Sequence, residues 1–321
     1  MKRRDFIVLT ASGVAGLPLL ALGDSSGRIW RMGFLAHGYE SFYDGLFETL
    51  ASLGYVEGKN LIVERRYAEG HSARFTELAA ELARLKPDVI VVSTTPAALA
   101  VKDIGIPVVF PNAVSPIESG VVASFANPGG NITGGAVQTA LLSTKRLGIL
   151  KEVVPGLSRG AVLWNAANPA LAYPWKETEL AASALGIKLQ SVEVRIPEDI
   201  DAAFTSIMQN SIDALIVLQD ALTLQHRQQI IDFTVRQHLP GMFVAREWVI
   251  AGGLISYGES LAEMYRRGAY FVDKILKGAK PADLPVEQMT NFELVLNLKT
   301  AKAMGWTIPA AIVTTADEVI E

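Results

Sequence analysis

The sequence contains no cysteine, and this absence excludes several kinds of chemistry at once. Disulfides, thiolate nucleophiles and cysteine-based zinc or iron–sulfur sites cannot form. Histidine is also scarce, and the four histidines are not spaced as metal ligands. The formal net charge is −4, so the sequence has no basic excess of the kind that attracts nucleic acid. We therefore expect no metal and no nucleic-acid partner.

The short motifs of common α/β enzymes are missing from the places where they would act. No Gly-x-Ser-x-Gly elbow stands between a predicted strand and a helix. No phosphate loop of the Gly-x-x-x-x-Gly-Lys-Ser/Thr type occurs, and no Gly-x-Gly-x-x-Gly fingerprint follows the first predicted strand. We expect no catalytic residues and no cofactor. An enzyme on the same fold is the less favoured alternative, because a fold alone does not exclude one.

The first 23 residues have the order of an export signal. A basic start is followed by an apolar stretch, Phe6–Leu22, which glycine and proline interrupt. Ala21-Leu22-Gly23 then offers small residues for cleavage. The Arg3-Arg4 pair indicates the twin-arginine route to the periplasm. We predict that residues 1–23 are removed and that the mature chain is not inserted in a membrane. The alternative is an uncleaved anchor or a buried helix.

From residue 28 onward, short apolar runs alternate with amphipathic stretches. Val89–Val92 is apolar at every position, as buried parallel strands are. Phe75, Leu78 and Leu82 recur at the spacing of one helix face. The same alternation restarts at Gly160. Strands separated by helices of this length imply right-handed βαβ units, so the sequence predicts an α/β protein of two halves with parallel sheets.

Polar residues follow the predicted strands of both halves, where ligands bind in parallel α/β sheets. Ser93, Thr94 and Thr95 follow a buried strand directly, and Thr95 is the expected N-cap of the next helix. The free N–H groups of such a helix start favour a carboxylate. Capping its own helix or stabilising a loop is the alternative role for each residue. The predicted cleft is lined by His37, Tyr39, Ser93, Thr94, Thr95 and Asn112 from one half and by Asn165, Asp220 and Tyr257 from the other.

Two further expectations concern the ligand. We expect Tyr39, Trp164 and Tyr257 to cover an apolar or aromatic body, because pockets are usually aromatic walls with a few polar groups. Asp220 decides the subclass of ligand. If its carboxylate reaches the cleft, it can pair with the ammonium group of an amino acid. If it is turned away, a plain aromatic or aliphatic acid is favoured. A lone histidine such as His37 is interpreted as structural rather than catalytic.

Several motifs carry a family resemblance. They are Gly54–Asn60, Asn127–Gly134, Gly252–Gly258, Val272–Gln288 and Ala316–Glu321. With these motifs the chain resembles the ABC-transporter substrate-binding proteins related to the tryptophan/phenylalanine binders. The resemblance implies a type I periplasmic-binding fold, in which two Rossmann-like lobes are joined by a hinge of three crossovers. Family members often carry Asp-Pro-Val after the strand at 107–110, whereas here Ser115 stands at the position of the acid.

The resemblance and the pattern together give a division of the chain and a function. The first lobe is expected at 28–138, completed by 259–288, and the second at 139–258, completed by 289–321. The resemblance implies a periplasmic solute-binding component of an ABC importer, which captures a small organic ligand by hinge closure and presents it to a membrane permease. The residues of the predicted cleft favour a carboxylate-bearing ligand such as an amino acid or an aromatic acid. An exported sensor that serves a signalling receptor is the alternative.

Overall fold

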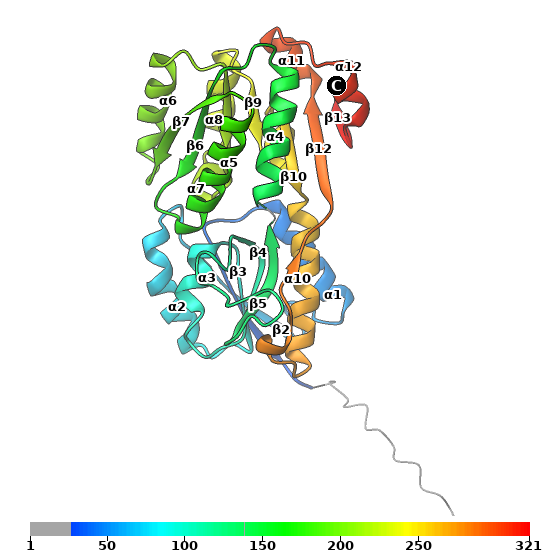
Figure 1. Ribbon diagram of the computed structural model, residues 1–321. Helices are drawn as coiled ribbons and strands as arrows, with labels where there is room; N and C mark the ends of the chain where they lie inside the picture. The colour runs from blue at the N-terminus through cyan, green and yellow to red at the C-terminus, as the bar shows by residue number, and fades with distance from the viewer. Residues whose placement is uncertain (1–26, 138) are drawn as a thin grey trace, which may run out of the picture.

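The computed structural model describes residues 27–137 and 139–321, so the predicted export signal lies outside the described residues. The described chain forms two lobes, each an α/β unit built on its own sheet (Figure 1). In the first lobe the strand order is β11-β5-β4-β3-β1-β2, and all pairs are parallel. These strands are β1 (Trp30–Ala36), β2 (Leu61–Tyr67), β3 (Val89–Val92), β4 (Val108–Val114), β5 (Ile132–Val137) and β11 (Glu287–Gln288).

The second lobe has the strand order β13-β12-β10-β9-β8-β6-β7. Its pairs are parallel except for the antiparallel pair β10–β12. The strands are β6 (Arg159–Asn165), β7 (Lys188–Val194), β8 (Ala214–Val217), β9 (Gly241–Phe243), β10 (Ile255–Glu259), β12 (Phe292–Asn297) and β13 (Glu318–Ile320). Two mainly parallel sheets with helices between the strands confirm the predicted α/β fold class.

The helices cover both sheets. In the first lobe they are α1 (Asp44–Ser52), α2 (Phe75–Arg84), α3 (Thr95–Val101) and α10 (Leu261–Leu276), with the short 3₁₀ turns η1 (Ser41–Tyr43), η2 (Ser72–Arg74) and η4 (Pro281–Asp283). In the second lobe they are α4 (Thr139–Val153), α5 (Ala172–Ala184), α6 (Asp199–Gln209), α7 (Ala221–Gln225), α8 (Arg227–Arg236), α9 (Arg246–Ile250), α11 (Leu298–Met304), α12 (Ala310–Thr315) and the 3₁₀ turn η3 (Pro169–Leu171).

The chain passes between the two sheets three times. It leaves the first sheet after β5, returns between β10 and α10, and crosses again between β11 and β12. Helix α10 follows a strand of the second lobe but packs against α1, β4 and β5 of the first. Late segments therefore complete both lobes, because each of them buries its apolar face against the sheet that it reaches.

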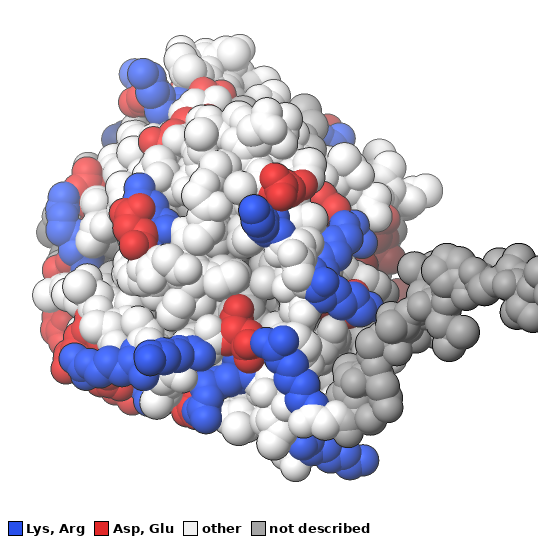
Figure 2. All heavy atoms as spheres, turned by 90° about the horizontal axis from the view of Figure 1, so that it is seen from below, with Lys and Arg blue, Asp and Glu red and all other residues white. Residues whose placement is uncertain are grey.

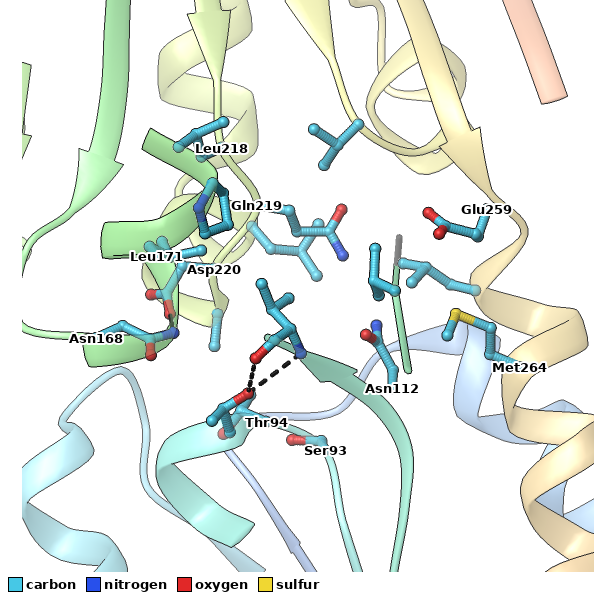
Figure 3. A pocket seen from close by; sticks show the side chains of 18 of the residues that line it. Ser93, Thr94, Asn112, Asn168, Leu171, Leu218, Gln219, Asp220, Glu259 and Met264 are labelled. Carbon is cyan, nitrogen blue, oxygen red and sulfur yellow. Dashed lines mark hydrogen bonds between the residues drawn. The ribbon is translucent and has the colours of Figure 1, made fainter. Parts of the chain in front are cut away.

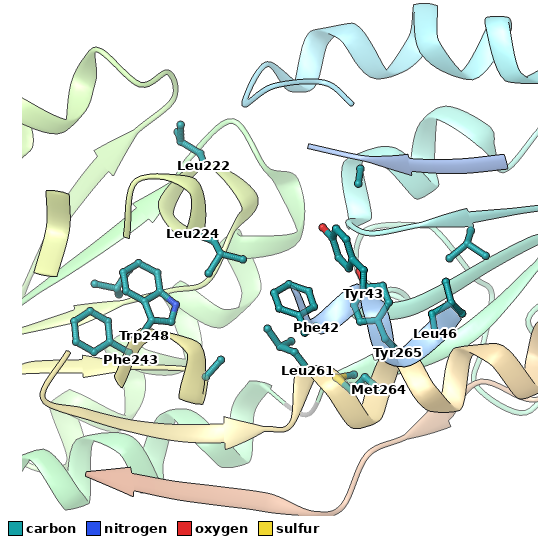
Figure 4. Packing of buried hydrophobic residues seen from close by; sticks show 14 of the residues in the cluster. Phe42, Tyr43, Leu46, Leu222, Leu224, Phe243, Trp248, Leu261, Met264 and Tyr265 are labelled. Carbon is teal, nitrogen blue, oxygen red and sulfur yellow. The ribbon is translucent and has the colours of Figure 1, made fainter. Parts of the chain in front are cut away.

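An aromatic cluster of the first lobe lies next to the second lobe. Phe42 and Tyr43 of η1 pack on Tyr265 of α10, with ring centroids 5.4 and 4.8 Å from that of Tyr265 (Figure 4). Tyr265 is almost fully buried. Burial of each such side chain stabilises the fold by about 1.5–3 kcal/mol. The cluster fixes η1 and α10 in position at the edge of the first lobe that faces the second.

The surface of the first lobe carries charges of both signs. The view from below shows Lys and Arg side chains interspersed with Asp and Glu over this face, without a continuous area of one sign (Figure 2). Such a face does not create the strong field of one sign that attracts a polyanion. None of the helices in the described ranges is both long enough and apolar enough to cross a membrane.

Candidate functional site

A cavity of about 100 Å³ lies between the two lobes and is lined from both of them. This is several times the ~10–15 Å³ that a single water molecule needs. The first lobe contributes η1, the loop after β3, the end of β4 and the start of α10. The second contributes α4, η3, the segment between β8 and α7, and the end of β10. The cavity therefore lies at the carboxyl ends of strands, where the sequence places it.

Five of the nine predicted site residues line this cavity: Ser93, Thr94, Thr95, Asn112 and Asp220. They come from three strand ends, those of β3, β4 and β8. His37, Tyr39, Asn165 and Tyr257 are not among its lining residues. The structure thus brings together residues from both lobes and directs the other four side chains elsewhere.

The start of α3 differs in detail from the prediction. The N-cap is Thr94, whose side-chain oxygen accepts a hydrogen bond of 3.3 Å from the backbone N–H of Ala97. The expected N-cap, Thr95, is the first helical residue instead. Its hydroxyl donates to the carbonyl of Val114 at 3.1 Å and accepts from the N–H of Val114 at 3.2 Å. Thr95 therefore fastens α3 to β4, an attachment that sequence patterns do not reveal.

Asp220 is a buried carboxylate at the N-cap of α7. One of its oxygens accepts from the side-chain amide of Asn165 at 2.7 Å and from the N–H of Leu222 at 2.8 Å. The other accepts from the side-chain amide of Asn168 at 2.8 Å. All these donors are neutral, and no ion pair within the described ranges includes Asp220. Asn165 acts on the site only indirectly, because it holds this carboxylate.

His37 and Tyr39 have structural surroundings. The His37 ring packs edge-on against Phe75 at 4.6 Å, and its Nε2 lies 3.4 Å from the Ser72 hydroxyl. Burial lowers the pKa of His37 to about 4, so the ring is neutral at pH 7. Tyr39 is 62% exposed, and its hydroxyl donates to the carboxylate of Asp44. The reading of His37 as a structural residue agrees with these contacts.

The aromatic wall of the cavity is not the expected one. Tyr257 packs toward Phe292, with ring centroids 6.1 Å apart, and Trp164 stacks with Trp175. The Trp164 indole N–H donates to the Ser191 hydroxyl at 2.9 Å. Trp164 is part of the hydrophobic core of the second lobe, and Tyr257 packs against that core. The aromatic side chains that line the cavity are Phe42, Tyr43 and Tyr265.

Four polar lining residues besides the tyrosines were absent from the sequence prediction: Asn168, Gln219, Arg146 and Glu259. Gln219 stands between β8 and Asp220, and its buried side-chain oxygen has no hydrogen-bond partner within the described ranges. Its position just after β8 could have identified Gln219 as a lining residue, by the same rule that identified Asp220. Arg146 and Glu259 also line the cavity, 6% and 5% exposed. Burial lowers the pKa of Arg146 to about 10, which leaves it charged at neutral pH. Nothing in the pattern of α4 distinguishes Arg146 from a surface arginine.

This combination of two lobes, three crossovers and an interlobe cavity is that of the two-lobed periplasmic binding proteins. The model of the ABC transporter substrate binding protein family matches residues 34–320. The chain belongs to this family. Its members bind solutes and do not catalyse reactions, so the protein is a substrate-binding protein and not an enzyme.

Individual proteins are similar to the chain over most of its length. A tyrosine-binding protein of Clostridioides difficile is 23% identical over 264 residues, which are 81% of this chain and 75% of that protein. A conserved domain protein of Vibrio cholerae is 26% identical, with a TM-score of 0.86, and an ABC domain of Streptococcus pneumonia in complex with L-Trp is 24% identical, with a TM-score of 0.83. Each comparison covers 91% of this chain and 100% of the other.

Proposed function

We propose that this protein captures an amino acid with an apolar or aromatic body and delivers it to the permease of an ABC importer. The observation that carries the proposal is the buried carboxylate of Asp220, which lines the cavity and accepts hydrogen bonds from neutral donors only. A buried carboxylate without a cationic partner is costly, and the ammonium group of a ligand would compensate it. The names of two similar proteins, which bind tyrosine and L-Trp, support this ligand class.

The remaining charges of the cavity also favour a zwitterion. Its ionisable lining residues other than the tyrosines are Arg146, Asp220 and Glu259, so their formal sum is +1 − 2 = −1. A plain carboxylic acid would add a second net negative charge, whereas an amino acid adds none. We expect the ligand carboxylate near the Ser93–Thr95 segment and the Asn112 amide, opposite Asp220. The apolar body would then lie against Phe42, Tyr265 and their neighbours.

We also propose that the two lobes close around the ligand, with the first lobe at 28–138 and 259–288 and the second at 139–258 and 289–321. A contact between the lobes supports closure. Arg227 of the second lobe donates at 2.9 Å to Glu40 of the first, and the Glu40 side chain is only 11% exposed. In Figure 1, α7, which precedes Arg227 in the chain, lies above α2 and α3. The ion pair therefore joins the two lobes directly, in addition to the three chain crossovers.

Removing this bridge is expected to weaken ligand binding without touching the ligand. A Glu40→Gln substitution should lower affinity roughly fivefold to tenfold, mainly through faster dissociation, because the closed state loses a partly buried ion pair. Stopped-flow and calorimetric measurements provide the test. A Glu57→Gln variant is the control, since Glu57 pairs with Arg65 within the first lobe. An unchanged dissociation rate in the Glu40→Gln variant would contradict the role of this pair in closure.

We propose that the protein is exported to the periplasm by the twin-arginine route, on the evidence of residues 1–23 alone. Replacement of Arg3 and Arg4 by lysine is expected to leave the full-length precursor in the cytoplasm, because that route reads the arginine pair. Cell fractionation with detection of the cleaved chain measures this. Normal periplasmic appearance of the double-lysine variant would refute the twin-arginine assignment. Cytoplasmic retention of the unaltered protein would refute export altogether.

The ligand class can be tested by a thermal-shift screen of the mature chain against amino acids, aromatic acids and other small metabolites. A ligand that binds only the native state stabilises it by RT ln(1 + [L]/Kd), about 2.7 kcal/mol at a hundredfold excess over Kd. We expect the largest shifts with aromatic or large apolar amino acids. If plain acids stabilise the protein and amino acids do not, the proposed ligand class is wrong.

A further inference from the structure

One end of the cavity holds a pair of opposite charges. Figure 3 shows Asp220 and Asn168 on one side of the cavity and Glu259, beside Met264, on the other, with Gln219 between them. Glu259 and Arg146 attract each other, and both are at least nine-tenths buried. A ligand whose ammonium group is at Asp220 would therefore direct the far end of its side chain toward Arg146 and Glu259.

Arg146 is held in place but retains donors for a ligand. Its Nε donates to the carbonyl of Tyr257 at 2.6 Å, which ties α4 to β10. A guanidinium has five N–H donors and no acceptor. Its terminal amino groups donate none of the hydrogen bonds found within the described ranges, and no ion pair there includes Arg146. A buried guanidinium that lines a cavity in this way offers hydrogen bonds to whatever occupies it.

We infer that Arg146 and Glu259 form a subsite for a neutral hydroxyl group, and that the ligand is accordingly a hydroxylated aromatic amino acid. This inference rests on the proposed function. A hydroxyl can accept a hydrogen bond from the guanidinium of Arg146, which has only donors. It can also donate one to a carboxylate such as that of Glu259, which has only acceptors. An anionic terminus would be repelled by Glu259, and a cationic one by Arg146. A hydrocarbon terminus would leave the terminal amino groups of Arg146 without compensation for the water that the ligand displaces.

The residues between the two ends fit the body of such a ligand. Phe42, Tyr265, Leu261 and Met264 line the cavity from the first lobe, and Leu224 lines it from the second. Aromatic and aliphatic walls with polar groups at defined points are the usual composition of small-molecule sites. The walls select a flat apolar body, and the charged pair selects its terminal substituent.

Calorimetry with tyrosine and phenylalanine tests the inference, because the two differ only in the terminal hydroxyl. We expect the wild-type protein to bind tyrosine about 10- to 100-fold more tightly, from hydrogen bonds to charged groups. Equal affinities, or tighter binding of phenylalanine, would overturn the hydroxyl subsite and leave the proposed function intact. Failure of all amino acids to bind would instead refute the proposed function.

The variants Arg146→Met and Lys145→Met then assign the preference to a residue. Lys145 is the exposed neighbour of Arg146 on α4, so its replacement removes the same charge from the same helix. In Arg146→Met we expect the preference for tyrosine to fall to within about threefold, because the hydrogen bond from Arg146 to the ligand hydroxyl accounts for most of that preference. In Lys145→Met we expect the preference to persist. A preference that persists in a folded Arg146→Met variant would contradict the subsite. If Arg146→Met does not fold, the preference for tyrosine over phenylalanine is measured in Glu259→Gln and compared with that of the wild type. A preference that persists there would contradict the subsite.

Discussion

An Asp220→Asn substitution is expected to weaken the binding of an aromatic amino acid by about 100-fold or more. Truncating one partner of a buried, hydrogen-bonded charge pair costs about 2–5 kcal/mol, and each 1.4 kcal/mol is a factor of ten. The substitution preserves the shape of the side chain but removes its charge. Calorimetry with the amino acid and with the matching acid that lacks the ammonium group measures the effect. Only the amino acid should lose affinity.

Two controls separate this effect from damage to the fold. Asparagine offers one acceptor oxygen where Asp220 uses two, so thermal unfolding of the variant must be measured alongside binding. Asp213→Asn is the matched variant, because Asp213 also accepts N–H groups in the second lobe, from Ser158 and Arg159, away from the cavity. Equal losses for the amino acid and the plain acid would argue against an ammonium at Asp220.

A Thr94→Val substitution complements this experiment at the opposite lobe. It removes the side-chain oxygen that caps α3 and thereby loosens the segment where we expect the ligand carboxylate. Loss of affinity in both the Thr94 and Asp220 variants supports an amino acid. Loss in the Thr94 variant alone supports a simple acid. Unchanged affinity in both would show that the ligand binds elsewhere.

A Gly258→Ala substitution is expected to destabilise the protein by about 3 kcal/mol or more, beyond the usual cost of overpacking. A Cβ atom at this position would lie 1.9 Å from the backbone carbonyl oxygen of Val244 and 3.0 Å from an amino group of Arg146. Relief of the first contact requires movement of backbone next to β10. The free energy of unfolding from denaturant titration, together with the midpoint of thermal unfolding, measures the loss.

The control for this substitution is Gly148→Ala in α4. A Cβ atom there would meet nothing within 4 Å, and alanine favours a helix over glycine by about 0.5–1 kcal/mol. This variant should be as stable as the wild type or more so. An unchanged free energy of unfolding in Gly258→Ala would contradict this prediction. It would show that β10 can move to accommodate the Cβ atom, together with the Tyr257 carbonyl that accepts a hydrogen bond from Arg146.

The sequence predicted the local elements well where periodicity is strong. The expected strand at Val89–Val92 corresponds to β3, and the helical spacing of Phe75, Leu78 and Leu82 falls in α2. Boundaries were less accurate. Thr95, which was expected to be the N-cap, is the first residue of α3, and the N-cap is Thr94.

The candidate site was predictable where a residue follows a buried strand directly. Ser93, Thr94 and Asp220 follow β3 and β8 and line the cavity, and Asn112 lines it from within the last part of β4. Tyr257 does not line the cavity, because its side chain packs against the hydrophobic core of the second lobe. Arg146 could not be found in this way, since it reaches the cavity from a helix.

The sequence by itself determined the α/β class, the repeated pattern of strands and helices, and the presence of polar groups at the strand ends. These features can be predicted because the hydrophobic pattern of a short segment indicates both its secondary structure and its burial. The tertiary structure alone decided which of those groups meet across the two lobes. It placed Arg146 and Glu259 together from segments more than a hundred residues apart. It also directed Thr95 to Val114 and Asn165 to Asp220, because hydrogen bonds between distant segments depend on packing that no local pattern encodes.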